Sequence, residues 1–124
     1  MKKQIFVVDD EDSVLYTVKH GLEDFSTDLQ VTALNSGRKC LQLLEQNQIP
    51  DLILLDIMMP EMNGWEIYNK IKQNNAWKQI PIVFLTARTD QVAKKAGQFY
   101  GEDYIEKPFK MPDLTERIRK VLFK

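Results

Sequence analysis

Five polar residues come directly after short apolar runs of the chain, and these are the residues that could do chemistry. They are Asp9, Asp10, Asp56, Thr86 and Lys107. If the runs are parallel strands of one sheet, the five side chains emerge at one edge, where open α/β sheets bind their ligands. Two like charges 4 Å apart cost about 4 kcal/mol at an effective dielectric constant of 20, so three carboxylates there need either protons or a cation.

The chemistry that suits this set of side chains is phosphoryl transfer. Carboxylate oxygens with incomplete coordination suit Mg²⁺, which keeps several waters and shares a phosphate group with the protein. Lys107 adds a positive charge and Thr86 a hydroxyl donor for the remaining phosphate oxygens. Because no serine, cysteine or histidine is suitably placed, Asp56 is the candidate nucleophile and would form an acyl phosphate.

Short apolar segments predict the strands that position these residues. The expected strands are 5–8, 29–34, 52–55, 80–85 and 103–106. The first, third and fourth are continuous apolar runs, which is typical of strands buried on both faces of a parallel sheet. The second alternates polar with apolar side chains, a pattern that predicts an edge strand.

Between these strands the apolar residues recur with helical spacing. The apolar stripes of five expected helices lie within 15–25, 40–44, 65–71, 92–99 and 114–122. We expect Asp12 or Ser13 to be the N-cap of the first helix. The second helix should begin at Ser36 and the third near Gly64, and Pro112 should lie in the first turn of the last helix. Strict alternation of strand and helix predicts a three-layer α/β sandwich with a five-stranded parallel sheet. If the strand order is 2-1-3-4-5, the ligand crevice lies between Asp10 and Asp56.

Length and composition limit the remaining possibilities. The 124 residues argue for one domain, and 44% hydrophobic with 28% charged residues supports a packed core. The net charge of −1 gives no electrostatic sign of binding to nucleic acid or to an anionic membrane. The single cysteine, Cys40, excludes an internal disulfide. No apolar run approaches the roughly 20 residues that cross a bilayer, and we expect a soluble, cytoplasmic protein without a signal peptide.

Five motifs fall in order on the ends of the expected strands. They are Val7-Val8-Asp9-Asp10-Glu11, Leu54-Leu55-Asp56-Ile57-Met58-Met59-Pro60, Gly64, Leu85-Thr86-Ala87, and Tyr104-Ile105-Glu106-Lys107-Pro108-Phe109. Together they resemble the receiver domains of two-component response regulators, the family typified by the chemotaxis regulator. The resemblance covers essentially the whole chain and implies one receiver domain over 1–124, with a flavodoxin-like sandwich of strand order 2-1-3-4-5 and five helices.

The resemblance also implies roles for individual residues. Asp56 would accept a phosphoryl group from a sensor histidine kinase or a histidine phosphotransfer protein. Asp10, Asp56 and the backbone carbonyl of Met58 would bind Mg²⁺ directly, with Asp9 acting through water. Thr86 would donate a hydrogen bond to the phosphoryl group.

Further implied roles concern Lys107, the loops and the switch. Lys107 would pair with a phosphoryl oxygen, and its peptide bond to Pro108 is expected to be cis. Pro60 and Gly64 would shape the loop after the third strand. Phosphorylation would draw the threonine inward and turn Tyr104 from an exposed to a buried position, which changes the surface of the fourth helix, fifth strand and fifth helix.

On this interpretation the chain is a regulator rather than an enzyme, and it catalyses only its own phosphorylation and dephosphorylation. Its output would be a changed binding face for a downstream protein, or for an output domain outside this chain, with no direct binding to nucleic acid and none to a membrane. The resemblance is also compatible with a homodimer that forms on phosphorylation. One departure is the spacing of 21 residues from Thr86 to Lys107, one fewer than the family pattern, with the missing residue just before the fifth strand.

Two alternatives belong to other classes. The segment Asp10-Glu11-Asp12-Ser13-Val14 also fits haloacid-dehalogenase-type phosphatases, with Asp10 as the nucleophile and Asp12 as the acid and base. Such enzymes need another acidic pair after the lysine, whereas only 17 residues follow Lys107, and Asp56 would have no role. The other alternative is a pseudo-receiver that only binds partners, although every expected site residue is present.

Overall fold

The computed structural model describes residues 2–87 and 102–123. Five parallel strands form one sheet: β1 (Lys3–Val8), β2 (Leu29–Leu34), β3 (Leu52–Asp56), β4 (Ile82–Ala87) and β5 (Asp103–Lys107). The helices of the described residues are α1 (Asp12–Phe25), α2 (Gly37–Glu45), α3 (Gly64–Lys72) and α5 (Met111–Leu122). The expected helix at 92–99 lies outside the described residues. None of the four described helices is both long and apolar enough to cross a membrane.

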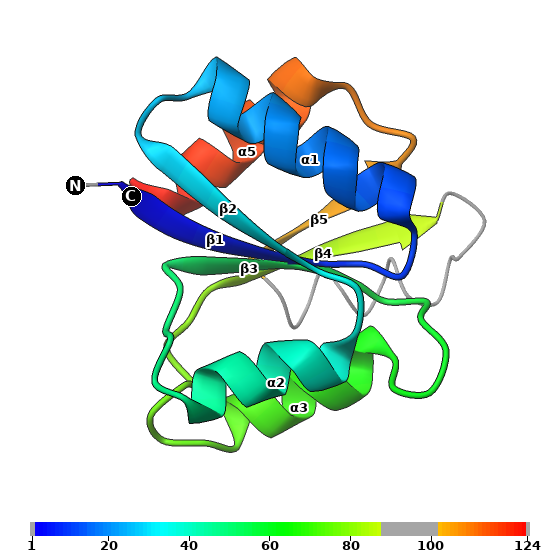
Figure 1. Cartoon of the computed structure of the whole chain (residues 1–124), viewed down its shortest axis with the longest axis vertical. Coiled ribbons are helices and arrows are strands. Elements are labelled where there is room, and N and C mark those ends of the chain that lie inside the picture. The colour runs from blue at the N-terminus through cyan, green and yellow to red at the C-terminus, as the bar shows by residue number, and fades with distance from the viewer. Residues whose placement is uncertain (1, 88–101, 124) are drawn as a thin grey trace.

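The strand order is β2-β1-β3-β4-β5, as predicted. Helices α1 and α5 cover one face of the sheet, and α2 and α3 cover the other, which gives three layers (Figure 1). The chain runs from β1 to β2 on one side and then crosses back to place β3 on the other side of β1, so the strand order reverses between β1 and β3. The carboxyl ends of β1 and β3 therefore lie at the switch point where open α/β sheets bind ligands.

The side chains of the central strands alternate between two cores. Ile5 and Val7 of β1 belong to the core that includes residues of α1 and α5, whereas Phe6 and Val8 belong to the core that includes residues of α2 and α3. β3 alternates in the same way. Because helices cover both faces, every position in these strands must be apolar, which explains the continuous apolar runs. Burial of each such side chain contributes about 1.5–3 kcal/mol, so the strand ends are held firmly.

Strand boundaries differ from the prediction by one or two residues. β4 begins at Ile82, two residues later than expected, because Pro81 has no N–H to donate to a neighbouring strand. Asp56, Thr86 and Lys107 lie within the last two residues of β3, β4 and β5 instead of after them. The pairing with neighbouring strands therefore positions the backbone of all three residues.

The predicted cap of α1 is wrong. The helix begins at Asp12, Glu11 occupies the N-cap position, and neither Asp12 nor Ser13 caps it. The Glu11 N–H donates a hydrogen bond of 2.9 Å to the Asp9 carboxylate instead. This loop is therefore shaped around the buried Asp9 side chain, and the helix starts without a side-chain cap.

The predicted starts of α2, α3 and α5 are confirmed. Ser36 caps α2, since its hydroxyl oxygen accepts a hydrogen bond of 3.2 Å from the Lys39 N–H. Pro112 lies in the first turn of α5. Helix α3 begins at Gly64, and its N-cap Asn63 forms a capping box with Glu66. This box fixes the end of the loop that leads from Asp56 into α3.

We expect Asn63→Ala to lower the free energy of unfolding by about 1 kcal/mol, because the substitution removes the side-chain oxygen that accepts a hydrogen bond from the first turn of α3. Asn63 Oδ1 accepts from the Glu66 N–H at 3.0 Å, and Glu66 Oε1 accepts from the Asn63 N–H at 3.4 Å. Urea unfolding measures the change. Asn69→Ala is the matched control, since Asn69 is exposed within α3, and this variant is expected to unfold within about 0.5 kcal/mol of the wild type. Equal stability of both variants would contradict the role of the cap.

Candidate functional site

Three aspartates meet where β1 and β3 end. Asp9, Asp10 and Asp56 each offer a carboxylate oxygen, and these oxygens lie within 4.8 Å of one another. The strand register explains why Asp9 and Asp56 lie close together. Val8 pairs with Leu55, and the residue that follows each of these two is an aspartate. Asp9 is fully buried and Asp56 is 3% exposed, whereas Asp10 is exposed. The predicted acidic cluster is therefore present, with two of its carboxylates enclosed by protein.

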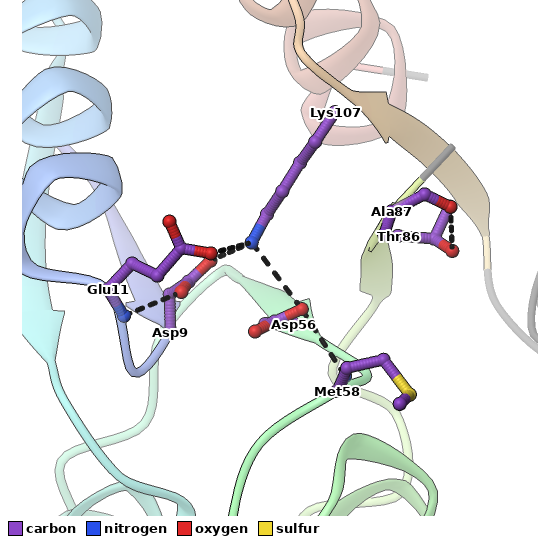
Figure 2. Close-up of polar contacts among 7 residues, drawn as sticks. All are labelled: Asp9, Glu11, Asp56, Met58, Thr86, Ala87 and Lys107. Carbon is purple, nitrogen blue, oxygen red and sulfur yellow. Dashed lines mark hydrogen bonds and ion pairs between the residues drawn. The ribbon is translucent and has the colours of Figure 1, made fainter. Parts of the chain in front are cut away.

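Lys107 reaches this cluster from the end of β5 (Figure 2). Its Nζ lies 2.8 Å from Asp9 Oδ2 and 3.6 Å from Asp56 Oδ1. The lysine is itself largely buried, and it supplies a positive charge between two buried carboxylates. Its peptide bond to Pro108 is cis, as expected. The structure thus brings together four of the five residues that end the strands in the sequence pattern.

Glu11 is a site residue that the sequence reasoning did not assign. Its Oε1 lies 3.6 Å from Lys107 Nζ, and its backbone N–H donates to Asp9 Oδ1 (Figure 2). The side chain is largely exposed, so it sits at the outer rim of the cluster. Its place inside the Val7–Glu11 motif, directly after the two aspartates, was the signal available in the sequence.

Burial and mutual repulsion raise the carboxylate pKa values. Burial, reinforced by the charge of Asp9, raises the pKa of Asp56 to about 7, although Lys107 partly offsets the effect. Burial likewise raises the pKa of Asp9, again against the attraction of Lys107. For Lys107, burial acts to lower the pKa, but Asp9 and Asp56 outweigh it and hold the pKa above the ordinary value. One lysine therefore does not neutralise the cluster.

The cluster fits a hard divalent cation. Asp9 Oδ2 is buried, and the Lys107 ammonium lies 2.8 Å from it. The same ammonium lies 3.6 Å from Asp56 Oδ1, so one positive charge faces two buried carboxylates, and buried charge of this kind is costly unless a further cation compensates it. Three carboxylates without nitrogen or sulfur ligands match the preferences of Mg²⁺.

Thr86 lies at the end of β4 but is not joined to the cluster. It is fully buried, and its hydroxyl donates to the Ala87 carbonyl oxygen at 3.3 Å (Figure 2). In the described part of the chain this hydroxyl makes no hydrogen bond to Asp56. Tyr104, the other expected switch residue, is half-buried and packs against the core on the α2 and α3 side. The expected change of both residues on phosphorylation stays a prediction.

The loop after β3 lies close to Asp56. The Met58 N–H donates to Asp56 Oδ1 at 3.4 Å, while the Met58 side chain is 61% exposed. Pro60 is exposed. Gly64 packs so closely on the end of β3 that a Cβ atom there would lie 2.5 Å from the Asp56 backbone oxygen. Gly64 therefore sets the distance between the start of α3 and the acidic cluster.

Comparisons with known proteins agree with this fold. A family model described as the response regulator receiver domain matches residues 5–119. The chain is 38% identical over 120 residues to the response regulator ArlR of Staphylococcus saprophyticus, a match covering 96% of this chain and 52% of that protein. It is 37% identical over 115 residues to a probable cyclic di-GMP phosphodiesterase of Vibrio cholerae, with 92% of this chain and 25% of that protein covered.

The solved structures point the same way. The crystal structure of a CheY-like response regulator receiver domain protein from Methanospirillum hungatei superposes with a TM-score of 0.79 at 39% identity, covering 94% of this chain and 91% of that one. The chain belongs to the response regulator receiver domain family. It is a receiver domain of two-component response regulators, which gives it a regulatory role.

Two further points follow from these matches. The chain spans about half or less of the length of the curated full-length relatives, including ArlR and the probable phosphodiesterase. The alternative of a haloacid-dehalogenase-type phosphatase with Asp10 as its nucleophile has no support in the comparisons. In the structure, Asp10 is an exposed loop residue, whereas Asp56 is the buried carboxylate at the end of a central strand.

Proposed function

We propose that Asp56 accepts a phosphoryl group from a sensor histidine kinase or a histidine phosphotransfer protein in a Mg²⁺-dependent reaction. The observation that carries this proposal is the position of Asp56, a buried carboxylate within 4.8 Å of two others and 3.6 Å from a lysine ammonium. Three carboxylates at one point are costly to the folded protein, because burial, reinforced by the charges of Asp9 and Asp10, raises the pKa of Asp56 to about 7. The arrangement is therefore suited to a ligand that carries both a cation and phosphate oxygens.

The group transfer can be assigned to the side chains of this chain. An ionised oxygen of Asp56 forms a bond to phosphorus while the bond from phosphorus to the donor histidine nitrogen breaks. The imidazole leaves with that electron pair and takes up a proton from solvent. Lys107, already 3.6 Å from Asp56, remains protonated and pairs with a phosphoryl oxygen. Thr86 turns its hydroxyl from the Ala87 carbonyl to another oxygen of the new group.

The metal would be held by Asp9, Asp10, Asp56 and the backbone carbonyl of Met58. When bound, Mg²⁺ supplies a Lewis acid that neutralises charge on the transferring phosphoryl group. Binding also displaces the proton that Asp56 holds near its raised pKa, so metal affinity should increase with pH across neutrality. This coupling would favour the ionised form of the nucleophile when the metal is bound.

The regulatory output is proposed to be the face formed by β5, α5 and the expected fourth helix, which lies outside the described residues. Tyr104 is half-buried on β5, and its backbone carbonyl accepts a hydrogen bond of 2.8 Å from Arg117 of α5. A movement of Thr86 on β4 would occur next to this face, because β4 pairs with β5. In that pairing Phe84 of β4 lies beside Tyr104. The domain would act on a downstream protein or on an output domain outside this chain, and it would catalyse only its own phosphorylation and dephosphorylation.

The experiment is intact mass spectrometry after incubation with acetyl phosphate and Mg²⁺. We expect the wild type to gain one phosphoryl group and Asp56→Asn to gain none, with no gain in the wild type when Mg²⁺ is chelated before the donor is added. Asp12→Asn is the matched control, since it removes an exposed carboxylate near the cluster and should leave the phosphoryl gain unchanged.

Two outcomes would overturn the proposal. A phosphoryl gain that persists in Asp56→Asn and disappears in Asp10→Asn would move the nucleophile to the loop after β1. A wild type that gains no phosphoryl group and does not bind beryllofluoride in the presence of Mg²⁺ would make the domain a pseudo-receiver that only binds partners.

A further inference from the structure

The outer edge of the sheet at β2 carries unpaired backbone groups. Among the described residues β2 pairs with β1 alone. The Lys3 N–H donates to the Asp28 carbonyl at 2.8 Å, and the Asp9 N–H donates to the Leu34 carbonyl at 3.1 Å. These bonds show that the even-numbered residues of β2 direct their backbone groups to β1. In a parallel pair the odd-numbered residues then direct theirs away from the sheet.

The composition of β2 offers no protection against the addition of another strand. Its sequence, Leu-Gln-Val-Thr-Ala-Leu over 29–34, has no charge, no proline and no glycine. Uncharged strands with high β-propensity at a sheet edge are templates for pairing with another chain, and natural edges usually carry a lysine or proline to prevent it. Any protection of this edge must therefore come from outside the strand.

Two side chains of α1 occupy the outward groups of Val31 at the centre of this edge. Glu23 Oε2 accepts a hydrogen bond of 2.9 Å from the Val31 N–H, and Lys19 Nζ donates one of 2.8 Å to the Val31 carbonyl oxygen. Lys19 and Glu23 also pair with each other at 3.1 Å. Although burial acts to raise the pKa of Glu23, the Val31 N–H and Lys19 hold it below the ordinary value, as expected for an ionised acceptor. We call these two residues the edge clamp.

We propose that the edge clamp prevents β2 of one molecule from pairing with β2 of a second copy of this chain. A second copy is the partner that the geometry favours, because two identical uncharged edges related by a two-fold axis can pair antiparallel about their centre. The clamp blocks the centre of that ladder by using both outward groups of Val31. The proposal concerns the β2 edge of the sheet, whereas Lys107 ends β5 at the opposite edge, and it does not depend on the phosphoacceptor function.

The test compares the unphosphorylated wild type with the double variant Lys19→Ala/Glu23→Ala. At low protein concentration, loss of the hydrogen bond to Glu23 should speed amide exchange at Val31 by about tenfold. At high concentration, sedimentation velocity should show the variant approaching twice the mass of the wild type, with the Val31 amide protected again. The matched control Glu116→Ala/Lys120→Ala removes another i,i+4 ion pair, on α5, and should behave as the wild type in both measurements.

A rescue variant identifies the surface. Ala33 is the exposed odd-numbered residue next along the edge, so Ala33→Lys should place a charge there. Added to the double variant, it should return the sedimenting mass to the wild-type value. Association that Ala33→Lys does not relieve would overturn the proposal, and so would a folded double variant that keeps the wild-type mass at high concentration, whatever its Val31 exchange rate. If the double variant does not fold, Glu23→Ala and Glu23→Gln separate the outcomes, because only the glutamine keeps an acceptor for the Val31 N–H.

Discussion

Asp56→Asn is expected to stabilise the metal-free protein by about 2–4 kcal/mol at pH 8. The carboxylate is buried, and burial together with Asp9 raises its pKa from 3.8 to about 7. A shift of about three pKa units corresponds to about 4 kcal/mol of unfavourable energy when the group is ionised in the folded state. Asparagine has a similar shape and no charge, so it removes most of this cost.

The pH dependence follows from the direction of the shift. Because the folded-state pKa of Asp56 lies above the unfolded-state value, the folded protein holds a proton between about pH 4 and pH 7 that the unfolded chain has lost. The stability of the wild type should therefore fall as the pH rises through this window and then level off. Asp9 contributes in the same direction, since its pKa is raised as well. The advantage of Asp56→Asn should disappear below about pH 4, where the wild-type carboxylate is protonated in both states.

Urea unfolding in the presence of a chelator, repeated from pH 4 to pH 8, measures these differences. Asp24→Asn is the control, because it removes an exposed carboxylate from α1 and keeps Asp56, so its stability should follow that of the wild type across this pH range. Adding Mg²⁺ should stabilise the wild type more than Asp56→Asn, since a ligand that binds only the folded state raises its stability. Equal stability of the wild type and Asp56→Asn at pH 8 would show that the cluster carries no electrostatic cost.

Gly64→Ala is expected to destabilise the protein by about 3 kcal/mol or more. A Cβ atom at this position would lie 2.5 Å from the Asp56 backbone oxygen and 2.8 Å from Ile57 Cα. The Gly64 N–H also donates to the Ile57 carbonyl oxygen at 2.9 Å, which holds the two backbones together. Backbone atoms of a central strand cannot move aside as a side chain can, so the overlap costs as much as strong overpacking. The backbone angles of Gly64 are ordinary, and the close approach alone demands glycine.

Gly21→Ala provides the matched control for this substitution. Gly21 lies in α1, and its added Cβ would meet the end of the flexible Met111 side chain, which can move away. The gain in helix propensity from glycine to alanine offsets part of this contact, so the variant should unfold within about 1 kcal/mol of the wild type. Thermal and urea unfolding compare the two variants. If both lose the same stability, the close packing of Gly64 on Asp56 is not what requires glycine there.

The order of the elements and most of the site could be predicted from the sequence. Continuous apolar runs identified the central strands, because a strand covered by helices on both faces has no polar position. Parallel topology then required residues at the strand ends to meet at one edge of the sheet, and the structure brings Asp9, Asp56 and Lys107 together there. The periodicity of apolar residues identifies each helix and strand locally. The rules for connecting parallel strands then indicate how these elements are arranged relative to one another.

Other features depended on contacts between residues far apart in the chain. The sequence does not distinguish Asp9 from Asp10, whereas strand pairing buries the first and leaves the second exposed. The cap of α1 was predicted wrongly because Asp9, a residue of the site, takes the Glu11 N–H. The Thr86 hydroxyl could not be oriented either, since its rotamer is chosen by neighbours within the core.

The sequence by itself therefore determined the alternation of strands and helices and the identity of the acidic cluster, because these depend on periodicity and on residue types at strand ends, while the strand order came with the family resemblance that its motifs carry. Only the tertiary structure decided which carboxylates are buried, how Glu11 joins Lys107, and how α1 closes the β2 edge at Val31. The physical reason is distance. Hydrogen bonds and ion pairs form over distances of about 3–4 Å. The pattern of apolar and polar residues assigns a residue to a helix or strand, but it does not fix the distance between two side chains to within a few ångströms.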